Sequence, residues 1–188
     1  MTNYRSSDTY IRGFEYLQMV RGFALESRMV DVMENLRDST VICNWIGQNI
    51  DKVNAQLNTY LQACHECFYL EERRNIQIFA VPLAQSLGID GLCNIWMCPI
   101  TILIDVGRMA PSDWFGLVAH EYAHAHVGSV GHNQEFANVL FHLCLGLGFP
   151  LPIWSASMME KNLRSWPYCQ SMTDPLAFWR GESDIYDI

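Results

Sequence analysis

The sequence predicts an α+β fold in which helices come first, a small β-sheet follows, and further helices complete the chain. Two observations lead to this prediction. Apolar residues recur every three or four positions through most of 8–68 and again through 112–146, which is the period of amphipathic helices. Between these stretches, 75–106 contains short β-branched runs bounded by glycine and proline, which is typical of strands.

The N-terminal helical region is the longest periodic segment. We expect residues 8–37 to form one long helix or two shorter ones, and 40–68 to form a helix with a cleaner apolar stripe. The charged sequence Glu-Glu-Arg-Arg at 71–74 then provides a natural break. At 188 residues the chain fits a single domain, which we divide into a helical part, 1–70, and a second part, 71–188.

Three strands are expected at the start of the second part. Residues 75–82 alternate and are rich in β-branched side chains, and 91–96 and 101–106 are two further apolar runs. Glycines and Pro99 separate the runs. We expect 101–106 to form an edge of the sheet.

Helices are expected again after the strands. The first covers 112–126 and ends at the glycines that begin with Gly128. Asn133 is a suitable cap for the next helix, 134–146. A further helix is expected near 155–164, before an irregular tail.

The balance of charges is acidic, because 20 Asp and Glu against 12 Lys and Arg give a formal net charge of −8. Broad nucleic-acid binding is therefore not expected, since phosphate binding requires clustered basic residues. The N-terminus lacks the apolar segment of a secretory signal, and no unbroken apolar run is long enough to span a membrane. With seven cysteines and no export signal, we expect a cytoplasmic protein with free, mostly buried thiols.

Four of the six histidines lie between His120 and His132, and this stretch begins with the pattern His-Glu-x-x-His. On a helix, His120 and His124 are one turn apart and about 40° apart around the axis, so both imidazoles can bind one zinc ion. Glu121 points in a different direction and reaches the water on the metal instead. Zinc lowers the pKa of that water to about 7, and a glutamate beside it acts as general base and then acid, which suits hydrolysis.

A catalytic zinc site needs a third protein ligand. His126 would lie on the opposite side of a continuing helix, which indicates a solvent-exposed or supporting residue. His132 follows a glycine-rich turn that lets the chain reverse over the helix, and Glu135 lies one turn further on. We favour His132 over Glu135, because imidazole is a common zinc ligand and the glycines deliver it.

The segment 120–136 resembles the SprT-like zinc metallopeptidases and related small gluzincin-like peptidases. Those proteins carry His-Glu-x-x-His, a variable loop, and then Gly-His-x-x-Glu-Phe. This resemblance implies a zincin-type helix and a following helix that carries the third ligand. It implies zinc as the cofactor, Glu121 as the catalytic base, and Phe136 as a packing residue. The zinc ligands that it implies are His120, His124 and His132.

These observations predict a zinc-dependent metallopeptidase whose substrate is a peptide or protein. We expect the substrate to pair in extended form with the sheet edge at 101–106. One alternative is a zinc hydrolase that acts on a non-peptide amide or a small metabolite in a closed, apolar site. The other is a non-catalytic interaction domain, which a four-ligand site completed by His126 or Glu135 would favour.

Several other residues carry two interpretations each. Cys64 and Cys67 have C-x-x-C spacing, which suits redox or metal chemistry, but Cys64 also falls on the apolar stripe of its helix. Asp105 is expected to cap a turn, and His142 either stabilises a transition state or has a structural hydrogen bond. The tail contains aromatic residues that line a substrate cleft or cover the sheet: Trp154, Trp166, Tyr168 and Trp179.

Overall fold

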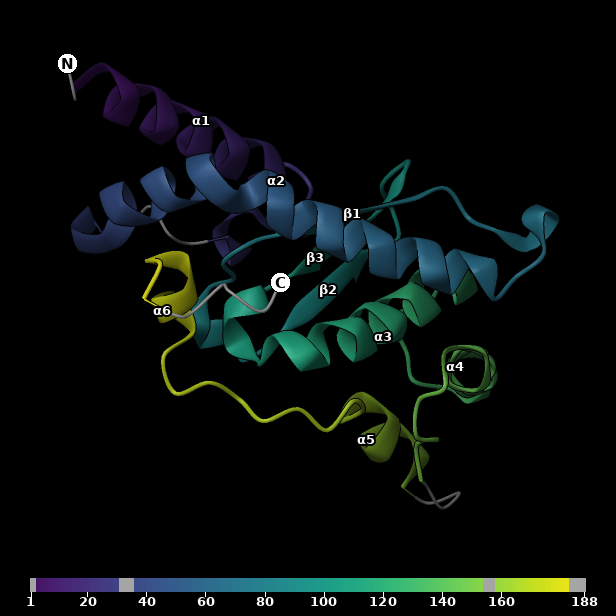
Figure 1. Cartoon of the computed structure of the whole chain (residues 1–188). Helices are drawn as coiled ribbons and strands as arrows, with labels where there is room; N and C mark the ends of the chain where they lie inside the picture. Colours follow the sequence, from purple (N-terminus) through teal and green to yellow (C-terminus); the bar gives the residue numbers. More distant parts are fainter. Residues whose placement is uncertain (1–2, 31–35, 154–157, 183–188) are drawn as a thin grey trace.

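A computed structural model of the chain describes residues 3–30, 36–153 and 158–182. Within these residues the protein has six α-helices and one three-stranded sheet (Figure 1). The predicted α+β class is therefore confirmed. In the same residues, no helix has the length and apolar character needed to cross a bilayer.

Two long helices, α1 (Asn3–Arg21) and α2 (Leu36–Glu66), form the N-terminal part. The first expected helical stretch ends at Arg21 and continues as a 3₁₀ turn, Ser27–Met29, so the interpretation as one long helix is wrong. Gly22 lies at this break and is followed by turn hydrogen bonds, which agrees with its low helix propensity. Residues 31–35 of the expected stretch lie outside the described residues.

Helices α1 and α2 touch through their backbones at two glycines. A Cβ atom on Gly13 would lie 1.9 Å from the carbonyl oxygen of Cys43, and a Cβ on Gly47 would lie 1.9 Å from that of Thr9. No side chain fits at such distances, so glycine at both positions permits this close crossing.

The sheet has the order β1-β3-β2, with β1 at Ile76–Ala80, β2 at Gly91–Asn94 and β3 at Ile100–Ile104. Strand β3 pairs in parallel with β1 and antiparallel with β2. The expectation that 101–106 forms an edge is therefore wrong, because β3 is central. The physical reason is burial: Ile102, Leu103 and Ile104 are fully buried, and a run that is apolar at every position is typical of a strand covered on both faces.

Helix α3 (Trp114–Val127) carries the His-Glu-x-x-His pattern and contacts α2, β2 and β3 (Figure 1). It ends at Gly128, whose φ of 71° is left-handed and whose N–H donates to the carbonyl of His124. Helix α4 (Gln134–Leu147) follows and packs against α3. The sheet and α2 thus hold α3 in place along most of its length.

The C-terminal part contains two short helices, α5 (Met159–Arg164) and α6 (Pro175–Trp179). Residues 154–157, which include the start of the expected helix 155–164, lie outside the described residues. Between α5 and α6, the segment 165–172 crosses the molecule and is held by a β-bridge from Ser171 to Met109. Residues 165–170 of this segment form one wall of a pocket.

Candidate metal centre

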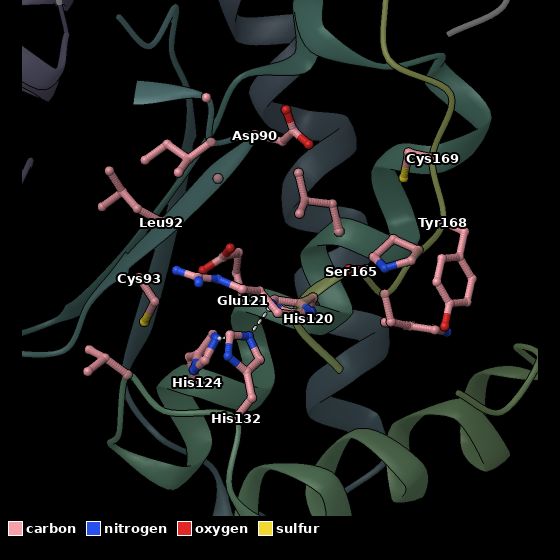
Figure 2. Close-up of a pocket in the computed structure, with 18 of the residues that line it drawn as sticks. Asp90, Leu92, Cys93, His120, Glu121, His124, His132, Ser165, Tyr168 and Cys169 are labelled. Atoms are coloured by element: carbon pink, nitrogen blue, oxygen red, sulfur yellow. Dashed lines mark hydrogen bonds between the residues drawn. The ribbon is translucent and has the colours of Figure 1, made fainter. Parts of the chain in front are cut away.

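Helix α3 and the loop after it bring three histidines together (Figure 2). The Nε2 atom of His132 lies 3.1 Å from Nε2 of His120 and 3.3 Å from Nε2 of His124. One nitrogen from each ring lies within 4.8 Å of the other two. Three imidazole nitrogens in this arrangement can bind one metal ion.

His132 reaches the cluster from the loop and not from a helix. It directly precedes Asn133, whose side chain caps α4 by accepting a hydrogen bond from the N–H of Phe136 at 3.0 Å. The expectation that the following helix itself carries the third ligand is therefore wrong, because His132 lies in the loop, two residues before the start of α4 at Gln134. The left-handed Gly128 makes the reversal, as the glycine-rich turn predicted.

Hydrogen bonding fixes the tautomer of one ring in the cluster. Nδ1 of His124 lies 2.9 Å from the carbonyl oxygen of Ser129. A carbonyl only accepts, so Nδ1 is the protonated nitrogen and the lone pair on Nε2 faces the cluster. Nδ1 of His120 is buried and has no well-formed hydrogen bond. The backbone of Trp166 raises the pKa of this ring and so favours its charged form.

Burial lowers the pKa of all three rings, which favours their neutral forms. It lowers the pKa of His120 well below 6.5, and the neighbouring imidazoles lower it further. It also lowers the pKa of His124. The pKa of His132 is lowered to about 4. Burial is the largest cause, followed by electrostatic repulsion from His124 and then from Arg164. In their neutral forms the rings can each offer one nitrogen lone pair, so one cation could be bound by all three rings at once.

Phe136 lies beneath the cluster and contacts every ring in it. The centroid of its ring is 4.4 Å from that of His124, 4.8 Å from that of His132 and 5.1 Å from that of His120. The packing role that the resemblance implied for Phe136 agrees with this geometry. The side chain limits the rotamers of all three imidazoles at once.

Glu121 lies beside the cluster without belonging to it. Its side chain is buried against β2, so that a Cβ on Gly91 would lie 3.1 Å from its Oε1. Burial and, to a smaller extent, the negative charge of Asp90 together raise the pKa of Glu121 to about 8. The site therefore holds a carboxyl group that binds protons far more tightly than a carboxyl in water.

A pocket of about 780 Å³ opens over the histidines. Figure 2 shows Leu92 and Cys93 of β2 on one side and Tyr168 and Cys169 on the other, with the histidines between them. Trp166 and Tyr168, which were candidates for a cleft, both line this pocket. Trp154, the third of those aromatic residues, lies outside the described residues.

The remaining candidates from the sequence lie elsewhere. Glu135 is exposed and is not part of the cluster, so His132 alone of the two candidates reaches it. His126 stacks on Phe68, with centroids 4.1 Å apart, as expected for a residue on the opposite side of α3. His142 makes the structural type of hydrogen bond, 2.6 Å from its Nε2 to the carbonyl of Cys67.

All seven cysteines are free thiols. Cys64 is fully buried in the core, in agreement with its place on the apolar stripe. Burial raises the pKa of Cys67, which is only partly exposed. The C-x-x-C pair thus shows no disulfide and no contact with the histidine cluster.

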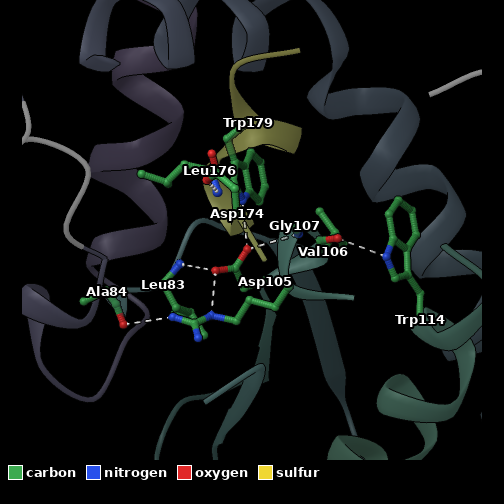
Figure 3. Close-up of polar contacts among 10 residues, drawn as sticks. Leu83, Ala84, Asp105, Val106, Gly107, Trp114, Asp174, Leu176 and Trp179 are labelled. Atoms are coloured by element: carbon green, nitrogen blue, oxygen red, sulfur yellow. Dashed lines mark hydrogen bonds and ion pairs between the residues drawn. The ribbon is translucent and has the colours of Figure 1, made fainter. Parts of the chain in front are cut away.

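A second buried polar cluster surrounds Asp105, outside the pocket (Figure 3). Its carboxylate accepts four hydrogen bonds, from Leu83 N at 3.0 Å, Gly107 N at 3.2 Å, Arg108 Nε at 3.1 Å and Trp179 Nε1 at 2.8 Å. Burial raises the pKa of Asp105 to about 6 against the effect of these donors. The expected turn-capping role is confirmed by the bond from Gly107, and Trp179 proves to belong to this cluster and not to a cleft.

Asp90 and Arg164 line the pocket but were not singled out from the sequence. Each lies in a loop or at the end of a short helix, where no periodic pattern marks it. Comparisons with protein-family models, with curated proteins and with solved structures found no match to this chain.

Proposed function

We propose that this protein is a zinc-dependent hydrolase that cleaves peptide bonds. The observation that carries the proposal is the convergence of His120, His124 and His132 on one point beside the buried carboxyl group of Glu121. Three protein ligands with an accessible pocket above them are typical of catalytic zinc sites, whereas structural zinc sites have four. Neither His126 nor Glu135 lies where it could be a fourth ligand.

The residues fit zinc by their chemistry. Neutral imidazoles are preferred zinc ligands, burial favours the neutral form of all three rings, and one nitrogen of each ring lies close to the other two. The bond from His124 Nδ1 to Ser129 is the type of outer hydrogen bond that orients a metal-binding histidine. A bound zinc ion would supply Lewis acidity and a water of lowered pKa.

Glu121 is placed to move the proton. A positive charge at the histidines lowers the pKa of a neighbouring carboxyl, which makes Glu121 available as a carboxylate near neutral pH. In this proposal the carboxylate accepts a proton from the attacking water and then donates it to the leaving amine. Its position against Gly91 keeps it fixed between α3 and β2.

The edge strand β2 offers a place for an extended peptide. The backbone N–H of Asp105 donates to the carbonyl oxygen of Asp90, so these two residues form a hydrogen-bonded pair that extends the antiparallel ladder. In such a ladder, hydrogen-bonded pairs occur at every second residue. By this alternation the N–H and C=O groups of Gly91 and Cys93 point away from β3, towards the outer edge of the sheet. A substrate paired with these groups would lie along the pocket that both residues line.

A second candidate is a hydrolase of a smaller, non-peptide amide. The apolar part of the pocket lining favours it, because Leu25, Met29 and Leu117 would bury an apolar substrate well. Both candidates use the same metal site and the same base. They differ only in whether the edge of β2 takes part in binding.

The test combines metal content with hydrolysis. Zinc-loaded wild type and Glu121→Gln are assayed on an unfolded protein, a peptide library and a panel of small amides. We expect both proteins to bind one zinc and the variant to lose about 100- to 10,000-fold in rate, because the amide cannot accept the proton. Glu135→Gln, the same change at an exposed site outside the cluster, is the matched control.

Each outcome separates the hypotheses. Undiminished cleavage by Glu121→Gln would remove Glu121 as the base. Cleavage of small amides but of no peptide would favour the second candidate. Zinc binding without any cleavage would favour an interaction domain with a structural metal. The absence of zinc binding would contradict both hydrolases and leave an interaction domain without metal.

A further inference from the structure

One permanently charged cation lies in the wall of the pocket. Arg164 is the last residue of α5 and is followed directly by Ser165, which Figure 2 shows on the pocket side opposite β2. Of the residues that line the pocket, Arg164 is the sole lysine or arginine. A guanidinium group presents five donors in a planar fork, which matches the two oxygens of a carboxylate.

Arg164 has no ion-pair partner within the part of the chain that the structure describes. Two acidic residues, Asp90 and Glu121, also line the pocket, yet neither lies within 4.0 Å of its guanidinium nitrogens. The donors of Arg164 are therefore free for a group that enters the pocket.

Arg164 lines the same pocket as the three histidines of the candidate metal centre. A cation near a site for a dication is unfavourable by itself, because the two charges repel. An anion bound between them would reverse the sign of this interaction.

We propose that Arg164 binds a carboxylate group of the substrate and selects acidic over neutral substrates. This inference rests on the proposed function, because it assigns a substrate to the same site. The carboxylate is either the C-terminus of a short peptide or the side chain of Asp or Glu in a longer one. Arg164 does not touch the reacting bond in this scheme, so it determines specificity and not the chemical step.

The alternative explanation is that Arg164 only stabilises α5. Basic residues in the last turn of a helix interact favourably with its carbonyl groups. Lys161 lies in the same last turn and does not line the pocket. A change at Lys161 therefore removes the same helix effect without touching the pocket, which makes it the matched control.

The test measures binding, so that it does not depend on turnover. Zinc-loaded Glu121→Gln protein is titrated calorimetrically with two pairs of N-acetylated peptides of identical sequence. The first pair differs in a C-terminal carboxylate or carboxamide, and the second, with amidated ends, in an internal Glu or Gln. We expect one of the two acidic peptides to bind about tenfold more tightly than its neutral partner, since a hydrogen bond between two charged groups is stronger than one to a neutral amide.

Adding Arg164→Gln should abolish this preference, Arg164→Lys should keep part of it, and Lys161→Gln should leave it unchanged. The pair that shows the preference identifies the source of the carboxylate.

Equal binding within both pairs, or a preference that survives Arg164→Gln, overturns the inference. If the preference depends on Arg164 but the wild type cleaves nothing, the proposed hydrolysis fails and the carboxylate site stands. If the wild type cleaves acidic and neutral peptides equally, the carboxylate site fails and the proposed hydrolysis stands.

Discussion

Two buried polar clusters in this protein differ in where their hydrogen-bonding partners come from. The carboxylate of Asp105 is surrounded by four donors of the chain itself, and Arg108 among them also donates to the carbonyl of Ala84 (Figure 3). The rings of His120, His124 and His132 instead each turn one nitrogen towards the other two (Figure 2). Asp105, His120 and His124 are all buried, so burial of these groups alone does not distinguish the clusters.

The difference teaches how a buried polar group is used. A group that the chain satisfies by itself contributes to folding and has nothing left to bind. A group that the chain leaves unsatisfied raises the energy of the folded state, and a ligand that satisfies it recovers that energy. By this criterion the Asp105 cluster is structural, and the histidine cluster is a group that could hold a metal ion.

The largest effect is expected from a substitution that breaks the Asp105 cluster. Asp105→Ala removes the acceptor of four buried donors and leaves Arg108 without its ion-pair partner, so we expect a loss of about 3–5 kcal/mol in the free energy of unfolding. Urea denaturation measures it. Asp51→Ala, which removes the exposed partner of Arg12, should cost at most about 1 kcal/mol. Similar losses in both variants would contradict the contrast between the clusters.

The pH dependence of stability sharpens the same contrast. The folded-state pKa of Asp105 is raised to about 6 from 3.8, so its contribution to stability is fully present below about pH 4 and is lost as the pH rises through 6. Asp105→Asn does not titrate there. The stability of the wild type relative to this variant should therefore fall by about 2–3 kcal/mol between pH 4 and pH 7, since one pKa unit is about 1.4 kcal/mol. Parallel curves for the two proteins would show that burial does not raise this pKa.

The unsatisfied cluster should respond to metal where the satisfied one does not. At a zinc concentration about 100 times the dissociation constant, we expect the wild type to gain about 2.7 kcal/mol in stability. His132→Ala should gain almost nothing, because it lacks a ligand. His126→Ala, the control on the other side of α3, should gain as much as the wild type. Calorimetric melting with and without zinc compares the three proteins.

The smallest expected effect separates the role of Glu121 as base from the binding of the metal. A Cβ at Gly91 would lie 3.1 Å from Glu121 Oε1, so Gly91→Ala must displace this carboxyl group by a few tenths of an ångström. We expect roughly tenfold slower hydrolysis, because a misplacement of about 1 Å costs about 100-fold. The zinc affinity should not change. A matching loss of zinc would mean that the variant disturbs α3 as a whole.

Local patterns predicted much of the fold and the core of the site. The period of apolar residues located the helices, and the spacing of His120 and His124 predicted that their rings would meet. The glycines before His132 predicted its return to the helix. These features depend on residues that are close in sequence, where helix and turn geometry leave few alternatives.

Features that depend on distant residues were not predictable in this way. The central place of β3 depends on its pairing with both β1 and β2, which no local pattern specifies. The turn role of Asp105 was foreseen, but its bond to Trp179 joins residues 74 positions apart. Arg164 lines a pocket together with residues of β2 and α3, which lie far from it in the sequence. Each of these arrangements is decided by packing between elements.

Phe136 gives the site a mechanical connection to the rest of the molecule. Its backbone N–H is held by the cap of α4, while its ring contacts all three histidines. A ligand that fixes the imidazoles must therefore also reduce the motion of the first turn of α4. Slower exchange of the amide hydrogens in that turn would report occupancy of the site from outside it, without a label or a substrate.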